Sequence, residues 1–166
     1  PQTGRVLVDG IDVAAEPTAA RRQLGVLPDA RGVYKRLTAR ENIDYFCGMY
    51  VYDAKIRRHL VDEAIDFVGL GEFRKFYPKK LSGGLLRRLN IACGIAHKPE
   101  LIFMDEPTVG LDPQHRGSIL DLVASLAADG MAVLETNHPL AGMALQFEVK
   151  VTEVAEPSDE DAVGDD

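Results

Sequence analysis

Apolar residues change their spacing along the chain, and each change marks a different kind of element. Short apolar runs on either side of Asp9-Gly10 predict a β-hairpin, and the run at residues 24–27 predicts another strand. Thr18 is a candidate N-cap in the polar segment between them. A loop is expected over residues 29–36.

From residue 38 onward the apolar positions recur with the period of a helix. Thr38 and Glu41 have the spacing of a capping box, and a second helix is expected from Asp53. That second helix would place four apolar side chains on one face, namely Ile56, Leu60, Ala64 and Phe67. Gly69 is expected to end it.

A third helix is expected directly after the sequence Leu-Ser-Gly-Gly at residues 81–84. Its apolar stripe consists of Leu85, Leu89, Ala92 and Ala96, with Arg87, Arg88 and Asn90 lying off the stripe. The start of a helix exposes backbone amides and carries positive potential, so a serine and two glycines there suit an anion. A lone Ser-Gly-Gly is more often an ordinary turn.

The next part of the chain has the pattern of a strand-helix-strand unit. The apolar runs at residues 101–104 and 131–134 are typical of buried parallel strands with a helix between them, which predicts an α/β fold. Asp105 and Glu106 follow the first strand and His138 follows the second, so all three are expected at the ligand-binding edge of the sheet. Taken alone, the Asp-Glu pair is more often a helix cap than a catalytic pair.

Composition indicates a globular domain with an acidic tail. The 166 residues are 46% hydrophobic, and no apolar run approaches the roughly 20 residues of a membrane helix. The net charge of −7 arises in residues 153–166, which hold seven acidic and no basic residues, and a segment of that kind is usually solvated and disordered. Cys47 and Cys93 lack metal-ligand spacing, which favours core packing in a reducing compartment such as the cytosol.

Several of these motifs, in this order and spacing, resemble the nucleotide-binding subunit of ABC transporters. The matching motifs are the signature sequence at residues 81–84, the Walker B strand with its carboxylates at 101–106, the D-loop at 110–112 and the switch histidine, His138. The resemblance extends from about Gly4 to about Leu145. Residues 24–42 are similar to the Q-loop and the start of the helical subdomain, most of all in ATPases of the sodium-efflux and multidrug export group.

This resemblance implies an α/β fold with a P-loop NTPase-like parallel sheet core, incomplete at the N-terminus, and an inserted α-helical subdomain. The chain would divide into four parts: residues 1–28 as an N-terminal β segment of the ATPase core, 29–98 as the Q-loop and helical subdomain with the signature motif, 99–150 as the RecA-like core with Walker B, D-loop and switch histidine, and 151–166 as the acidic tail.

The resemblance also implies roles at the nucleotide that belongs to the chain itself. Asp105, acting through water, would help to hold Mg²⁺, Glu106 would polarise the attacking water, and His138 would contact the γ-phosphate of ATP. Asp29 stands where the family usually has a glutamine on Mg²⁺. Its carboxylate could still bind the cation but would add a negative charge near the phosphates.

Other residues would act on the nucleotide of a second subunit. Because ABC ATPases pair head to tail, Ser82, Gly83 and Gly84 of one chain would contact ATP bound to the other chain, with Asp112 of the D-loop as a further nucleotide-binding residue. Leu85 stands where the family commonly has a glutamine, which removes a side-chain donor but keeps the backbone amides. The pair would be a homodimer or a heterodimer.

The implied function is ATP binding and hydrolysis coupled to transport, with export expected and with ATP and Mg²⁺ as cofactors. Transmembrane permease subunits would hold the chain at the cytoplasmic face of the membrane, through the helical region near residues 29–52. No nucleic acid is expected as a partner. Once the tail is set aside, the body of the chain carries 19 acidic and 19 basic residues, and this balance gives no electrostatic argument for nucleic acid, although it does not exclude one.

The P-loop of the family, Gly-x-x-x-x-Gly-Lys-Ser/Thr, does not occur in the 166 residues. The resemblance therefore describes a fragment, and the chain alone is expected to be inactive and to bind ATP feebly. The strand at residues 101–104 expects a parallel neighbour on each side, so loss of the P-loop strand predicts unpaired backbone, exposed apolar surface and poor stability.

Two other functions use the same motifs. A non-catalytic or truncated partner would supply only residues 82–84 in trans, although Glu106 and His138 would then have no use. A non-transport ABC ATPase of the chromosome-maintenance or translation-factor kind would need long coiled coils in its helical subdomain or a second tandem domain. The segment at residues 29–81 shows no heptad run, and the chain shows one such domain.

Overall fold

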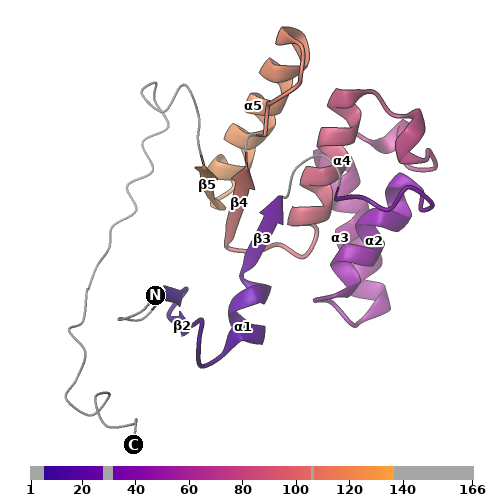
Figure 1. Cartoon of the computed structure of the whole chain (residues 1–166). Helices are drawn as coiled ribbons and strands as arrows, with labels where there is room; N and C mark the ends of the chain where they lie inside the picture. The colour runs from indigo at the N-terminus through magenta and orange to yellow at the C-terminus, as the bar shows by residue number, and fades with distance from the viewer. Residues whose placement is uncertain (1–5, 28–31, 106, 137–166) are drawn as a thin grey trace, which may run out of the picture.

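A parallel sheet of three strands lies at the centre of the computed structural model, which describes residues 6–27, 32–105 and 107–136 (Figure 1). The strands are β3 (Leu24–Leu27), β4 (Leu101–Asp105) and β5 (Ala132–Thr136), in the order β3-β4-β5. The register pairs Leu24 with Leu101 and Leu101 with Ala132. Strands that are distant in sequence therefore meet with their carboxyl ends at one edge.

The middle strand β4 has a parallel partner on each side. Its backbone pairs with β3 and with β5, and the side chains of Ile102 and Met104 are fully buried. The expectation that this strand would be left with unpaired backbone is wrong. The reason is the strand order, because both partners of β4 come from within the described part of the chain.

The predicted hairpin is confirmed as a separate small sheet of β1 (Leu7–Val8) and β2 (Ile11–Asp12). Asp9 has φ 49° and Gly10 has φ 73°. Positive φ at both central positions defines the type I′ turn, which Asp-Gly favours.

The short helix α1 (Pro17–Arg22) follows the hairpin, and Thr18 is not its N-cap. Glu16 occupies that position without a capping side-chain hydrogen bond, and Pro17 begins the helix. Proline suits the first helical position because its φ is already helical and its missing N–H has no partner there. Thr18 consequently lies inside the helix.

The helices α2 (Ala39–Gly48) and α3 (Ala54–Phe67) begin where the sequence predicts. The capping box of α2 is present: Thr38 Oγ1 accepts a hydrogen bond from the Glu41 amide, and the Thr38 amide donates to Glu41 Oε2. These bonds hold the pKa of the Glu41 carboxyl below its usual value. The confirmed capping box fixes where α2 begins.

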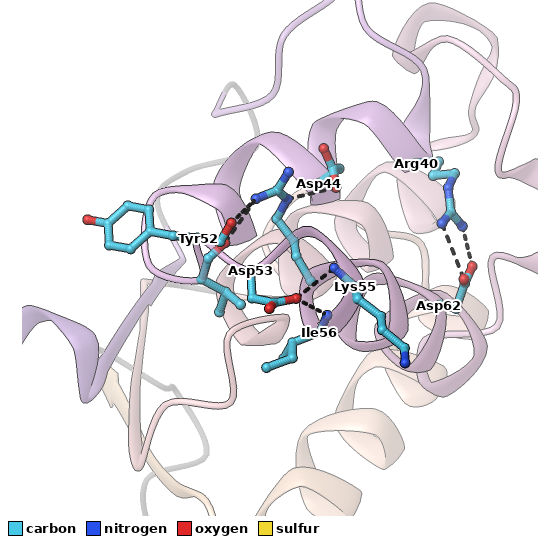
Figure 2. A network of polar contacts seen from close by, with 9 residues as sticks. Arg40, Asp44, Tyr52, Asp53, Lys55, Ile56 and Asp62 are labelled. Carbon is cyan, nitrogen blue, oxygen red and sulfur yellow. Dashed lines mark hydrogen bonds and ion pairs between the residues drawn. The ribbon is translucent and has the colours of Figure 1, made fainter.

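Polar contacts join α2 to α3 along their exposed sides (Figure 2). The two terminal guanidinium nitrogens of Arg40 on α2, Nη1 and Nη2, donate to the Asp62 carboxylate on α3, and the hydrogen bond from Arg40 lowers the pKa of Asp62. The Asp53 carboxylate caps α3 by accepting from the amides of Lys55 and Ile56, at 2.8 and 2.9 Å. The helix pair is therefore held together outside its apolar contact as well as within it.

The apolar face of α3 agrees with the predicted one except at its start. Ala64 is buried, and Leu60 and Phe67 pack against the core beside the buried Val61 and Ile65. Ile56, in the first turn, is instead 55% exposed. Gly69, with φ 70°, ends the helical region as predicted.

Helix α4 (Gly83–Ile95) packs against α2 and α3 on one side and against β3 and α5 (Pro113–Ala128) on the other. Two short 3₁₀ helices, Gly71–Phe73 and Pro78–Lys80, connect α3 to it. Both cysteines are free and buried, and burial raises the pKa of Cys47 to about 11. The prediction that the cysteines pack in the core is confirmed.

His97 joins the end of α4 to the start of the sheet. Its Nε2 lies 3.1 Å from the carbonyl oxygen of Leu24, so Nε2 carries the hydrogen and donates, and its ring stacks on Tyr50 with 4.2 Å between centroids. Nδ1 is buried and has no hydrogen-bond partner among the described residues. Burial therefore lowers the pKa of His97 below its ordinary value of 6.5.

This burial predicts that the chain loses stability in mild acid. Below pH 6.5 the unfolded chain binds a proton at residue 97 that the folded chain excludes, so the free energy of unfolding should fall as the pH decreases through that range. Urea unfolding measured between pH 8 and pH 5 should show this fall, and His97→Gln should weaken it. A pH dependence in His97→Gln equal to that of the wild type would contradict the assignment.

Candidate functional site

The sequence Leu-Ser-Gly-Gly forms the start of α4. Ser82 is the N-cap, and its Oγ accepts a hydrogen bond from the Leu85 amide at 3.3 Å. Ser82 and Gly83 are exposed, whereas Gly84 is buried. The first amides of a helix have no carbonyl one turn earlier to bond, and the helix dipole adds positive potential at this end. This turn, called the signature turn below (residues 81–84), is chemically suited to an anion.

Asp112 caps the first turn of α5. Its Oδ1 accepts a hydrogen bond from the His115 amide at 3.1 Å, and its Oδ2 lies 2.6 Å from Nδ1 of the His115 ring. The preceding Gly110 has φ 75°, a conformation that favours glycine. Asp112 is thus part of a tight turn between β4 and α5, the D-loop (residues 110–112).

The signature turn and the D-loop lie side by side within one chain. A Cβ atom added at Gly83 would lie 3.6 Å from Cδ2 of Leu111, and one added at Gly84 would lie 2.3 Å from Cδ2 of His115. Real Cβ atoms do not approach a neighbour to less than 3.0 Å. A larger residue at position 84 would therefore force the His115 ring to shift, independently of any ligand.

Arg87, which the helical pattern places off the apolar stripe of α4, is buried and 5% exposed. Its Nε donates a hydrogen bond of 2.7 Å to the carbonyl oxygen of Pro107, in the segment that follows β4. Asn90 is likewise buried. Arg87 and Asn90 are buried because neighbouring elements surround α4 on nearly every side. The run of small and apolar residues from 91 to 96 is the sequence feature that indicates a helix buried all round.

The remaining predicted site positions are not described. Asp29, Glu106 and His138 lie outside the described residues, as does the side chain of Asp105. The backbone of Asp105 ends β4 and pairs with that of Thr136 at the end of β5. The structure thus brings Ser82, Gly83 and Gly84 beside the D-loop of Asp112, while the metal and catalytic residues remain predictions.

Within the described residues, no group of three or more His, Cys, Asp or Glu side chains could hold a metal ion. The two predicted Mg²⁺ ligands, Asp29 and Asp105, are not among the side chains searched. The same part of the chain contains no helix that is both long enough and apolar enough to span a membrane.

Comparison with known proteins supports the resemblance seen in the sequence. The ABC transporter family matches residues 1–109. The linearmycin resistance ATP-binding protein LnrL of Bacillus subtilis is 39% identical over 136 residues, which cover 82% of this chain and 44% of LnrL. The daunorubicin/doxorubicin resistance ATP-binding protein DrrA of Streptomyces peucetius is 39% identical over 140 residues, covering 84% of this chain and 42% of DrrA. The chain spans less than half the length of these relatives.

Solved structures of ATP-binding cassettes have the same fold. The dimeric, post-hydrolysis structure of the ATP-binding cassette MJ0796, bound to ADP and Pi, superimposes with a TM-score of 0.70 at 27% identity and covers 84% of this chain and 65% of that one. An ATP-binding subunit of an ABC transporter gives a TM-score of 0.68 at 26% identity, covering 85% and 59%. The predicted fold class, a P-loop NTPase-like α/β core with a parallel sheet, is confirmed.

The hydrogen bond of Arg87 yields a test of how α4 is attached to the segment after β4. Arg87→Met keeps much of the side-chain volume but leaves the Pro107 carbonyl without this donor, so the free energy of unfolding should fall by about 1–3 kcal/mol. Urea denaturation measures the fall, and amide hydrogen exchange should quicken at residues 108–112. Arg116→Met, at an exposed arginine of α5, is the matched control; equal effects of the two substitutions would exclude a special role for Arg87.

Proposed function

The chain belongs to the ABC transporter family, and from this premise we propose that it forms part of the ATP-binding and ATP-hydrolysing subunit of an ABC exporter. The observation that carries the proposal is the signature turn, with Ser82 as N-cap of α4 and the D-loop directly beside it. Export is proposed because the similar proteins are named for drug resistance and, in Sinorhizobium fredii, for Nod factor export.

The signature turn is proposed to bind a nucleotide held by a second ATP-binding subunit. The exposed Ser82 and Gly83 and the amide-rich start of α4 would contact the γ-phosphate, which the positive end of the helix dipole stabilises. The dimeric state of MJ0796 supports a paired arrangement. Closure of the pair around ATP would then bring this turn onto the nucleotide, and hydrolysis would release it.

The carboxyl edge of the sheet is proposed to serve the nucleotide of the chain's own subunit. Asp105 ends β4 at this edge, and its carboxylate oxygen is the type of ligand that Mg²⁺ prefers, as is that of Asp29. Mg²⁺ held there would supply positive charge against the negative charge of the phosphates. Glu106 would take up a proton from the attacking water, and His138 would orient that water and the γ-phosphate.

A permease surface is proposed on the helical region. Tyr34 and Tyr45 are 46% and 45% exposed, and their rings meet edge to face with 4.8 Å between centroids. The loop that carries Tyr34 is fixed, because the side chain of the buried Asn42 accepts from the Tyr34 amide at 2.7 Å and donates to the Tyr34 carbonyl. Clustered exposed aromatic residues mark interaction sites. Contact with a permease through this cluster would hold the subunit at the cytoplasmic face of the membrane.

The proposed base gives the test of this function. In the purified transporter that contains this chain, Glu106→Gln should reduce ATP hydrolysis by about 10²–10⁴-fold, because an amide cannot accept the proton from water. ATP binding, measured with a fluorescent ATP analogue, should persist. Glu100→Gln, at an exposed carboxylate beside the opposite end of β4, should keep full turnover.

An unchanged rate in Glu106→Gln would contradict the catalytic proposal. The chain would then act only through its signature turn, in trans to a complete partner.

A further inference from the structure

Two side chains of the D-loop region cover the signature glycines from within the same chain. Leu111 lies against Gly83, and the imidazole of His115, from the first turn of α5, lies against Gly84. The His115 side chain is 45% exposed, so its removal leaves no buried cavity of full side-chain size. The ring lies between the signature turn and the D-loop.

Asp112 fixes the orientation of the His115 ring. One carboxylate oxygen holds the His115 amide at 3.1 Å and the other holds Nδ1 at 2.6 Å, so backbone and ring are bound by the same group. With Nδ1 directed at Asp112, the opposite edge of the ring, at Cδ2, faces Gly84. The hydrogen bonds from Asp112 thus fix the ring in its contact with the signature turn.

We propose that His115 is a positioning residue that joins the signature turn to the D-loop of the same chain, so that the two motifs move as one body. The inference rests on the proposed function, in which the signature turn contacts the nucleotide of the second subunit while the segment from β4 to the D-loop belongs to the chain's own site. His115 would therefore transmit a shift at one ATP site to the other.

Arg87 restrains the same pair of segments at a second point. Its hydrogen bond to Pro107 lies one turn further along α4 than Gly84, and it reaches the opposite end of the loop from His115. Two separated contacts resist rotation of the helix start as well as translation. A displacement of about 1 Å at a site that binds a reacting group can cost on the order of 10²-fold in rate, so such restraint is functionally significant.

A double-substitution cycle on the full chain tests the contact itself. Gly84→Ala places a Cβ atom 2.3 Å from the ring, whereas in His115→Ala the nearest remaining atom of residue 115 is its own Cβ, 3.2 Å away. Gly84→Ala should therefore lower the melting temperature strongly in the wild type and much less in the His115→Ala background. Equal shifts in both backgrounds would overturn the proposal.

The positioning role is tested by ATP hydrolysis in the transporter that contains the chain. His115→Ala should lower kcat by about tenfold without changing KM for ATP, because its own nucleotide site is intact while closure onto the second is impaired. His115→Asn should recover part of kcat, since its amide can still donate to Asp112. Ser125→Ala, near the other end of α5, where the Ser125 hydroxyl donates to the Asp121 carbonyl of the same helix, is the control.

The outcomes separate the two proposals. If the wild type hydrolyses ATP and His115→Ala matches it in kcat, the positioning role falls and the proposed function stands. If the wild-type transporter shows no ATP hydrolysis, the proposed function falls and this inference falls with it. A reduced melting temperature of His115→Ala with unchanged kcat indicates a merely structural residue and overturns the proposal.

Discussion

The close approach of α4 to the segment that follows β4 is the constraint on which the rest of the structure depends. A side chain at Gly84 would have to displace the His115 ring, and Arg87 donates a hydrogen bond to Pro107 one turn later. These contacts attach the helical region to the parallel sheet at a point next to the expected catalytic edge. Packing against His115 therefore favours glycine at position 84, separately from any role in phosphate binding.

The strand order explains why a parallel sheet forms within this chain. Because β4 lies between β3 and β5, its backbone is paired on both sides, and the side chains of Ile102 and Met104 are buried. The matched residues cover less than half of the relatives LnrL and DrrA. The described residues nevertheless contain a core that runs from α2 and α3 through α4 to the sheet and α5.

Local features were predictable from the sequence, and features that depend on neighbours were not. The caps at Thr38, Asp53 and Ser82 follow from residue types and spacings within one turn, and all three are present. The exposure of Ile56 and the burial of Arg87 depend on which elements pack alongside each helix. The spacing of apolar residues within a single helix carries no information about those neighbours. The contact of His115 with Gly84 joins two motifs that the sequence presents as separate, and no spacing rule connects them.

A structure of the complete transporter with ATP bound tests the central claim most directly. The account predicts that Ser82 Oγ and the amides at the start of α4 lie within hydrogen-bond distance of a γ-phosphate held by the second ATP-binding subunit, with the His115 ring still against Gly84. A signature turn that faces solvent in the ATP-bound state, with no phosphate near it, would contradict the account.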